Sequence, residues 1–296
     1  MIESTDWRAL RAQKLEQLTN LGLPVAPNRY AGTRASEDIR GNAAALEGER
    51  VRVAGRLMTV RLMGKAAFAH IQDAEGQIQL YFKRDALGDE AYAYFKLLDV
   101  GDVIGAEGTV FTTRTAEVSV QVESVVLLAK SYHPLPDKFH GLADVEARYR
   151  RRYLDLIANE DARRTFRLRS AIVRCLRQFL DERGFVEVET PILQPIYGGA
   201  AAEPFTAHYN ALDMTAYLRI ATELYLKRLI VGGFDKVYEI GKDFRNEGFS
   251  RKNSPESTML ELYQAYADYN DMMALTEDMF VTTCQAVLGS NQATYD

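Results

Sequence analysis

The chain has 296 residues, of which 47% are hydrophobic and 26% are charged, as in ordinary globular proteins. That length predicts two domains rather than one. The formal net charge of −5 excludes a surface covered in basic side chains, although it leaves room for a local basic site.

The cysteines and the N-terminus predict the cellular compartment. Cys175 and Cys284 have neither a CxxC partner nor a nearby histidine, which argues against a zinc site or a disulfide framework. The N-terminus lacks the apolar core of a signal peptide, and no apolar run reaches membrane-spanning length. We therefore expect a cytoplasmic protein with no membrane association.

The first part of the chain predicts a helix followed by a small β-barrel. Residues 3–21 place apolar side chains near helical spacings and end before Gly22, as an amphipathic helix does. Residues 51–128 contain five short β-rich runs, with a helical pattern, ALGDEAYAYFKLL, after the third. A β-sandwich is an alternative, but five strands with one helix after the third favour an OB-fold, a barrel that often binds oligonucleotides.

A linker with two prolines separates this barrel from the second half of the chain. Four arginines cluster near its end, at Arg148, Arg150, Arg151 and Arg152. Such a cluster forms either a solvated helix face or a contact with nucleic acid or another domain. Both interpretations remain open from the sequence.

The second half of the chain predicts an antiparallel sheet with flanking helices. Its patterns do not alternate as a parallel βαβ series would. A long amphipathic helix is expected at 163–182, and FVEVETPIL reads as a strand up to Pro191. Further strands are expected in TAYLRIA, KVYEIGKDFRNE and STMLELYQAYADY, with helices in TELYLKRLIVGG and DMMALTEDMFVTTCQAVLG.

The last two of these strands carry alternating charges. In a hairpin, Arg245 and Glu247 would share a face with Glu261 and Tyr263, while the other face is mostly apolar. Arginine binds phosphate or carboxylate at two points, and carboxylates bind ammonium groups. The pattern therefore indicates a site for a zwitterionic or phosphorylated small molecule. The alternative is a solvent-facing strand whose charges discourage aggregation.

A resemblance to a known family identifies this stretch. FRNEG, followed by PE, T and ELYQAYADY, resembles motif 2 of class II aminoacyl-tRNA synthetases in the form seen in lysine–tRNA ligases. GFVEVETPIL resembles motif 1, and RYRRRYLDLI, YGGAAAEPF, YLRIATELYLKRLIVGGFDKVYEIGKDFRNEG and GRLMTVRLMGKAAFAHIQDAEGQIQLYF resemble the bacterial lysine enzyme. The resemblance runs from about residue 5 to about residue 288. An aspartate or asparagine enzyme is the less favoured alternative.

The resemblance implies an α+β fold in four parts. These are an N-terminal helical extension (1–48), an OB-fold anticodon-binding domain (49–130), a linker (131–160) and the first part of a class II antiparallel-sheet catalytic domain (161–296). It also implies a homodimer whose interface includes Pro191 in motif 1.

The implied reaction is the ATP-dependent attachment of lysine to tRNA(Lys) through lysyl-adenylate. Arg245 would be the catalytic residue, holding the α-phosphate and the substrate carboxylate, while Glu247 and Asn253 would contact ATP. Such an enzyme works by positioning and charge stabilisation rather than through a covalent nucleophile.

The resemblance also assigns residues that bind the other substrates. Gly199 and Glu223 match positions that hold the α-amino end of lysine, and Glu261 and Tyr263 match the pocket for its ε-ammonium group. In the barrel, three residues match the family's readers of the anticodon uridines, by stacking and by hydrogen bonds to base edges. These three are Phe68, Gln79 and Glu117.

The sequence also departs from the family. No glycine-rich motif 3 with its arginine occurs in these 296 residues. The family's Mg²⁺ ligands are expected beyond residue 296, so no metal ligand is assigned in this chain. Family members usually have histidine near Asn253 and phenylalanine, which stacks on adenine, at Ser257. We therefore expect an N-terminal portion of a longer enzyme, inactive alone; the alternative is a non-catalytic tRNA-binding module.

Overall fold

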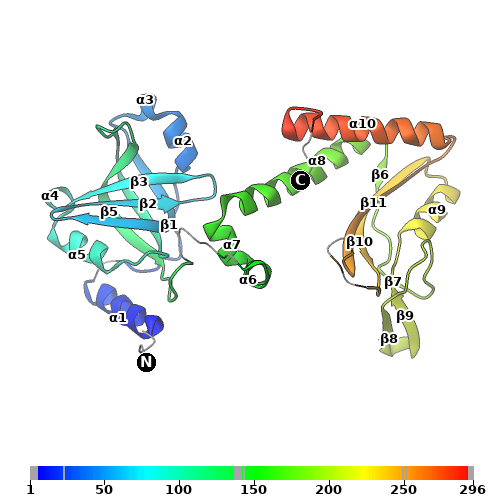
Figure 1. Ribbon diagram of the computed structural model, residues 1–296, viewed down its shortest axis with the longest axis horizontal. Coiled ribbons are helices and arrows are strands. Elements are labelled where there is room, and N and C mark those ends of the chain that lie inside the picture. Colours follow the sequence, from blue (N-terminus) through cyan, green and yellow to red (C-terminus); the bar gives the residue numbers. More distant parts are fainter. Residues whose placement is uncertain are drawn as a thin grey trace. The chain divides into compact units, whose positions relative to one another are not determined.

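A computed structural model describes residues 6–22, 24–136, 142, 144–248, 250 and 253–292. The chain divides into two compact units, Met1–Asn159 and Glu160–Asp296, whose elements are labelled in Figure 1. The boundary between them falls inside the predicted linker. Each unit is described by itself.

The first unit is built on a closed five-stranded barrel, which confirms the predicted OB-fold architecture. The strands follow one another around the barrel in the order β1-β2-β3-β5-β4, with β3 and β5 parallel and the other pairs antiparallel. They are β1 (Arg50–Met63), β2 (Ala66–Gln72), β3 (Gln77–Lys83), β4 (Val103–Thr112) and β5 (Val118–Ala129).

Alternating side chains fill the barrel and cover it. The inward positions are apolar and almost completely buried, among them Leu57, Ile71, Leu80, Val110 and Val120. Full burial of each such side chain contributes about 1.5–3 kcal/mol to the free energy of unfolding. The outward positions are thereby left for polar and aromatic side chains.

Helices surround this barrel. The predicted single helix after β3 is in fact two, α4 (Arg84–Leu87) and α5 (Asp89–Leu97), because Gly88 between them adopts φ of 85°. A positive φ is accessible to glycine and interrupts a helix. The patterns at α2 (Ser36–Gly41) and α3 (Ala43–Leu46) were too short to be predicted.

The N-terminal helix α1 (Trp7–Asn20) is fixed by one buried arginine. The Arg11 guanidinium donates to the carbonyl oxygens of Ser131 (2.7 Å) and His133 (3.0 Å) through Nη1. Its Nη2 donates to the carbonyl of Val100 at 3.2 Å. These bonds join α1 to the segments that precede β4 and follow β5.

The arginine cluster lies on two short helices, α6 (Val145–Arg150) and α7 (Arg152–Ala158), where a linker was predicted. The Arg148 guanidinium pairs with the buried carboxylate of Asp155 at 2.9 Å, and Arg152 pairs with the same carboxylate. Arg150 pairs with Glu146 on the exposed face at 2.6 Å. Three of the four arginines therefore have local acidic partners.

The second unit contains two small sheets. In order of strand position they are β11-β10-β6 and β7-β9-β8. The strands are β6 (Val186–Glu187), β7 (Leu193–Gln194), β8 (Thr206–Tyr209), β9 (Met214–Leu218), β10 (Lys236–Phe244) and β11 (Glu256–Gln264), with a 3-10 turn at Asn210–Leu212. The helices are α8 (Glu160–Asp181), α9 (Glu223–Val231) and α10 (Tyr269–Leu288).

The predicted strand FVEVETPIL is much shorter in the structure. Only Val186–Glu187 and Leu193–Gln194 pair, and β6 runs parallel to β10 rather than antiparallel. Pro191 lies between the two pieces, outside both strands, because it has no N–H to donate. Strand β8 was not predicted, since its sequence lacks the alternation of apolar residues that marks a strand.

Helices α8 and α10 cover one face of the β10–β11 hairpin (Figure 1). Tyr238, Ile240, Leu260 and Leu262 of the hairpin pack with residues of both helices and with Phe185. This confirms that the even-numbered face of β10 is the packing face and leaves the odd-numbered face for the charged residues. No described helix combines the length and the apolar character needed to cross a membrane.

Candidate functional site

The charged face of the hairpin β10–β11 forms the floor of the candidate site in the second unit. The strands pair antiparallel in one unbroken register, in which Glu239 faces Glu261 and Val237 faces Tyr263. Gly241 faces Met259, and Asp243 faces Ser257. The predicted hairpin and the common face of Glu261 and Tyr263 are therefore confirmed by the register.

A buried arginine that the sequence analysis did not single out anchors this floor. Arg219 follows β9, and its guanidinium lies 2.5 Å from Glu239 Oε1 and 3.3 Å from Asp243 Oδ1. It also donates to the Lys242 carbonyl at 2.8 Å and to the Thr190 hydroxyl at 3.1 Å. The buried charges of Arg219 and Glu239 are tolerated because they pair with each other and make further hydrogen bonds.

Gly241 makes room for that guanidinium. A Cβ atom at position 241 would lie 2.1 Å from Arg219 Nη2, which no real structure permits. The arginine and the glycine therefore depend on each other, although they are far apart in the sequence.

Asp243 is the least satisfied carboxylate of the floor. Its Oδ1 atom is buried without a hydrogen-bond partner among the described residues, although it faces the Arg219 charge. Burial raises the pKa of Asp243 to about 6, with further upward contributions from Glu261 and Glu239 that Arg219 and Arg245 oppose. Part of the population of this side chain is therefore protonated near neutral pH.

Glu261 and Tyr263 lie half-buried beside the start of α9. The Glu261 Oε2 atom accepts a hydrogen bond from the Thr222 backbone N–H at 3.0 Å and another from the Thr222 hydroxyl. Burial, together with the negative charges of Glu261 and Glu223, raises the pKa of Tyr263 to about 12. The phenol consequently stays protonated and able to donate at neutral pH.

Glu223 and Gly199 complete this corner. Gly199 has φ of 86°, and a Cβ atom there would lie 2.9 Å from the Glu223 Cβ. The glycine thus allows close approach of its backbone to Glu223. The Lys227 ammonium lies 2.6 Å from a Glu223 carboxylate oxygen and 5.9 Å from the centre of the Tyr263 ring.

The remaining predicted residues of this unit lie nearer the edge. Arg245 follows β10, is half-buried, and donates through Nε to the Ile220 carbonyl at 3.4 Å. Glu247 is exposed beyond the end of the strand. Asn253 is exposed and its backbone is hydrogen-bonded to Ser250, and Pro191 is exposed. The structure brings Arg245 to the floor but leaves Glu247 and Asn253 outside its hydrogen-bonded cluster.

The candidate site in the first unit is the outer surface of the barrel. The registers place its side chains in two rows that cross all five strands. The first row consists of Thr59, His70, Gln79, Ser119 and Phe111. The second row consists of Arg61, Phe68, Tyr81, Gln121 and Thr109.

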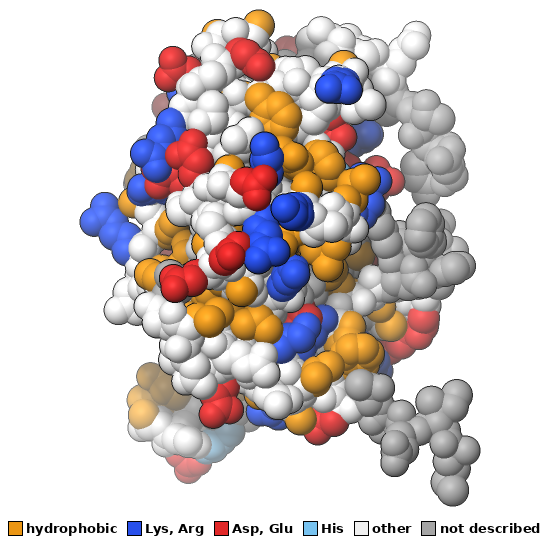
Figure 2. All heavy atoms as spheres, turned by 90° about the vertical axis from the view of Figure 1, so that its left-hand side faces the viewer, with side chains coloured by type: hydrophobic (Ala, Val, Ile, Leu, Met, Phe, Trp, Pro, Cys, Tyr) orange, Lys and Arg blue, Asp and Glu red, His pale blue; other side chains and the backbone are white. Residues whose placement is uncertain are grey.

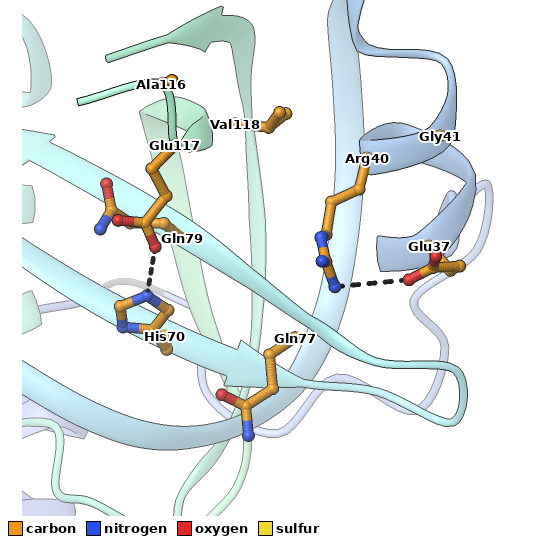
Figure 3. A pocket seen from close by; sticks show the side chains of 9 residues that line it. All are labelled: Glu37, Arg40, Gly41, His70, Gln77, Gln79, Ala116, Glu117 and Val118. Atoms are coloured by element: carbon orange, nitrogen blue, oxygen red, sulfur yellow. Dashed lines mark hydrogen bonds and ion pairs between the residues drawn. The ribbon is translucent and has the colours of Figure 1, made fainter. Parts of the chain in front are cut away.

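A pocket of about 560 Å³ opens beside the first row, as Figure 3 shows. Gln79 and Glu117 both line it, which brings two of the three predicted barrel residues together. The His70 ring joins Glu117 (Nε2 to Oε1, 2.8 Å) to the Thr59 hydroxyl (Nδ1 to Oγ1, 2.9 Å). Arg40 stands across the pocket, paired with Glu37 at 3.4 Å.

Phe68, the third predicted barrel residue, lies on β2 in the second row, next to His70 of the first row. Its ring centroid is 4.9 Å from that of Tyr81, which in turn is 5.8 Å from that of Phe111. Phe68 is half-buried, so part of its ring is open to solvent. Exposed aromatic rings beside polar groups are suited to stacking and hydrogen bonding with bases.

Figure 2 shows a face of the first unit with its side chains coloured by type. There, basic, acidic and apolar side chains are interspersed.

The described residues do not fit a metal site. Across those parts of the chain, no group of three or more His, Cys, Asp or Glu side chains is placed to hold an ion. No chemical step is therefore assigned to Mg²⁺.

Sequence reasoning missed Arg219, Thr222 as a partner of Glu261, His70 and Ser119. Arg219 had a visible signal, namely a single charge between Leu218 and Ile220 in an otherwise apolar run. The roles of the other residues depend on pairings between distant strands, and nothing in their local sequence marks them.

Two family models match the chain. The model of the family "OB-fold nucleic acid binding domain" matches residues 51–128. The model of "tRNA synthetases class II (D, K and N)" matches residues 144–295, more than half of the chain. The chain therefore belongs to the class II tRNA synthetases of the D, K and N group, a class of ligases.

Among individual proteins, the chain is similar to bacterial lysine–tRNA ligases. It is 54% identical to that of Carboxydothermus hydrogenoformans over 97% of this chain and 59% of the relative. It is also 54% identical to those of Clostridium botulinum (strain Langeland) and Pelotomaculum thermopropionicum, over 97% of this chain and 57% and 56% of the relatives. The chain thus spans somewhat more than half the length of these curated relatives.

Proposed function

We propose that the chain serves the ATP-dependent attachment of lysine to tRNA(Lys) through lysyl-adenylate, in the cytoplasm and as part of a homodimer. The observation that carries this proposal is the corner formed by Glu223, Glu261 and Tyr263. Two carboxylates flank a protonated phenol there, and an ammonium group, that of Lys227, already lies against one of them. Such a corner is chemically suited to a second ammonium, that of substrate lysine.

Glu261 and Tyr263 bind the ε-ammonium group in this proposal. The two hydrogen bonds from Thr222 fix one oxygen of Glu261, so the other oxygen can accept from the ligand. Glu223 binds the α-amino group, which requires Lys227 to give up its contact. The side chains of aspartate and asparagine have no ammonium group, so this corner disfavours the aspartate or asparagine alternative.

Arg245 stabilises the charge that develops during activation. The lysine carboxylate attacks the α-phosphorus of ATP, the bond to the bridging oxygen breaks, and pyrophosphate leaves. A guanidinium beside both anions lowers their repulsion and the charge of the transition state. The half-burial of Arg245 and its effect on the pKa of Asp243 place it beside the acidic floor, which supports this role. Glu247 and Asn253 are proposed to contact ATP from the edge.

The barrel reads an anticodon uridine in this proposal. Phe68 stacks on the base, Gln79 donates its amide N–H to a base carbonyl, and Glu117 accepts from the ring N–H. A donor beside an acceptor matches the adjacent carbonyl and N–H of uracil. Cytosine presents an acceptor nitrogen and an amino group instead, which Gln79 and Glu117 do not match.

Lysine binding tests the corner. Calorimetry on the 296-residue chain should show lysine binding at least about 10-fold more tightly than norleucine, which lacks the ε-ammonium, because a charge-assisted hydrogen bond contributes about 1.5–3 kcal/mol. Glu261→Gln should abolish that difference, whereas the exposed change Glu277→Gln should preserve it. Equal binding of lysine and norleucine would reject the assigned pocket, and lysine-dependent ATP–pyrophosphate exchange would test activation directly.

RNA binding tests the barrel separately. An anticodon hairpin of tRNA(Lys) with uridine at the middle position should bind more tightly than the same hairpin with cytidine. Phe68→Ala should weaken binding by about 10-fold or more, since stacking contributes about 1–3 kcal/mol per base. Unchanged affinity would remove Phe68 from the site.

A non-catalytic tRNA-binding module is the second candidate function. It is supported by the barrel pocket, whose reading groups all lie in the first unit. Uridine-selective RNA binding without lysine selectivity or lysine-dependent exchange would favour this candidate.

A further inference from the structure

We propose that Arg40 binds the RNA phosphate next to the base that occupies the barrel pocket, and so supplies affinity that does not depend on sequence. This inference rests on the proposed binding of an anticodon at that pocket. It concerns the wall that α2 forms, across the pocket from Gln79 and Glu117.

Helix α2 is held firmly against the barrel, which gives Arg40 a defined place. The Ser36 backbone N–H and hydroxyl donate to the two carboxylate oxygens of Asp73, at 2.6 Å and 2.8 Å. Ile39 is completely buried in the apolar interior of the first unit. Asp73 lies in the turn between β2 and β3, and β3 carries Gln79. The helix that carries Arg40 and the strand that carries a base-reading group are therefore fixed relative to each other.

Arg40 is the cation of an otherwise acidic pocket. Among the described residues that line it, Arg40 is the only lysine or arginine, whereas Glu37 and Glu117 are carboxylates. Figure 3 shows the Arg40 side chain reaching from α2 toward the barrel strands. Because like charges repel, the RNA backbone can approach the two carboxylates only where a cation offsets them. Arg40 is placed to provide that cation.

The Arg40 guanidinium has N–H groups that are not yet bonded. Its Nη1 atom lies 3.4 Å from Glu37 Oε2, which is longer than a usual N–H···O bond. The side chain is 53% exposed and makes no other ion pair or hydrogen bond with the described residues. A guanidinium carries five N–H groups in a fork that fits two phosphate oxygens. Since an exposed pair one helical turn apart is weak, Glu37 does not prevent Arg40 from binding a phosphate.

A phosphate suits this position better than a base does. The pocket of about 560 Å³ lies in the size range that encloses whole small ligands, so it holds more than one planar base. A base bound by Gln79 and Glu117 on the barrel leaves its sugar and phosphate toward α2. Contacts to phosphate hold a nucleic acid in place whatever its sequence. In this arrangement Arg40 positions the nucleotide, and the barrel reads its base.

Removal of the Arg40 charge should weaken binding equally for every base. Each phosphate contact to a single strand contributes about 0.7 to the slope of log affinity against log salt concentration, and Arg40→Ala should lower the slope by that amount. Affinity at low salt should fall by about 3- to 10-fold, the effect of one net hydrogen bond. The affinity ratios between bases should stay unchanged, because a phosphate carries no base identity. Arg40→Lys keeps the charge and should keep the slope.

The experiment measures affinities by fluorescence anisotropy at several potassium chloride concentrations. Anticodon hairpins that carry uridine, cytidine, adenosine or guanosine at the middle position are titrated with the full chain, with Arg40→Ala and with Arg40→Lys. The matched control is Arg34→Ala, because Arg34 is also exposed and paired with a carboxylate, that of Asp38, but does not line the pocket. This control should keep the full salt slope. Circular dichroism and thermal unfolding verify that each variant is folded.

A second variant should strengthen binding, which misfolding cannot imitate. Glu37→Gln removes the carboxylate that competes with phosphate for Arg40. Affinity for all four hairpins should therefore rise by about 2- to 5-fold, the scale of an exposed ion pair. Asp38→Asn removes the same charge from the next residue of α2, but Asp38 pairs with Arg34, so this control should have a smaller effect. No gain in Glu37→Gln, or an equal gain in Asp38→Asn, would overturn the inference.

The outcomes separate this inference from the base-reading proposal. An equal loss of slope in Arg40→Ala and Arg34→Ala, or a changed base ratio with an unchanged slope, would overturn the phosphate contact and leave base reading intact. Absence of any base preference in the unsubstituted chain would overturn base reading. A salt slope that falls only in Arg40→Ala would still support the phosphate contact in that case.

Discussion

The two units arrange their polar side chains in opposite ways relative to their apolar interiors. The barrel keeps its interior apolar and places its candidate site on the outer surface, where hydroxyl, imidazole and amide groups hold one another by hydrogen bonds. The second unit has a small apolar cluster on one face of its hairpin and buries Arg219, Glu239 and Asp243 on the other. In the barrel, the proposed base-reading groups lie outside the apolar interior, whereas in the second unit the proposed lysine corner adjoins the buried charges of the floor.

The largest expected effect is a loss of stability in the second unit. Arg219→Met removes the cation from two buried carboxylates, and breaking a buried pair in this way costs about 3–5 kcal/mol of unfolding free energy. Hydrogen exchange of the β10 amides should report the loss, while amides in β2 and β3 keep their protection. Lys242→Ala, which breaks only an exposed pair with Glu256, is the control. A loss below about 1 kcal/mol would mean that the buried charges do not hold the floor.

The next effect concerns pH and also distinguishes the units. Because folding raises the pKa of Asp243 from 3.8 to about 6, its protonated form stabilises the fold at low pH. That contribution, up to about 3 kcal/mol, is complete below the unfolded pKa and disappears as pH rises through the folded one. Denaturant unfolding of the second unit should therefore give higher stability at pH 5 than at pH 7. Asp243→Asn should remove that difference.

The stability of the first unit should depend on pH with the opposite sign and in a lower pH range. Burial opposes the charged forms of Asp73, Asp99 and Asp155, but hydrogen bonds and ion pairs outweigh it and lower the pKa of all three. Their stabilising contribution is present above the unfolded pKa and is lost only as pH falls below it. Between pH 7 and pH 5 the barrel should change little. A parallel shift in both units would show that the difference does not arise at Asp243.

A smaller effect is expected from the residues that support the barrel pocket. His70→Ala removes the bond that orients Glu117 and should weaken uridine hairpin binding by about 3- to 10-fold, the effect of one net hydrogen bond. Thr59→Val, which removes only the hydroxyl beyond His70, should have a smaller effect. The melting temperature should hardly change, because both side chains lie outside the apolar interior. Unfolding of the barrel by His70→Ala would contradict this expectation.

The smallest effect is expected in the arginine cluster. Arg150→Ala breaks an exposed pair with Glu146 on α6 and should cost no more than about 0.5 kcal/mol. Arg148→Ala, which weakens the pairing of buried Asp155, should cost more. Equal effects in thermal unfolding would mean that the burial of Asp155 does not matter.

The sequence predicts those features that repeat with a regular period. The five barrel strands, the helix α8 and the hairpin of β10 and β11 all follow from alternation or helical spacing, and so does the common face of Glu261 and Tyr263. The strand expected in FVEVETPIL up to Pro191 is too long, because pairing stops at Glu187 and the alternation does not show where pairing with a partner strand ends. The alternation of β10 also predicted that Glu247 would share the charged face of the strand. The strand ends at Phe244, so Glu247 lies outside it.

Contacts across the sequence were beyond such reasoning. Thr222 and Glu261 are hydrogen-bond partners that lie 39 residues apart in the sequence. A local sequence pattern compares only residues that lie much closer together. Ser119 and Gln79 are separated by 40 residues and meet only because β3 and β5 run parallel. Residues that orient a functional group tend to come from another element, so their identity depends on the assembled sheet.

The three carbonyl bonds of Arg11 bear on how the barrel can be prepared by itself. Two of its acceptors, the carbonyls of Ser131 and His133, lie beyond the last barrel strand. A piece cut immediately after Ala129 would leave a buried guanidinium short of acceptors, at a cost of about 1–3 kcal/mol or more for a charged group. A minimal barrel fragment should therefore start before α1 and extend through His133 to retain its full thermal stability.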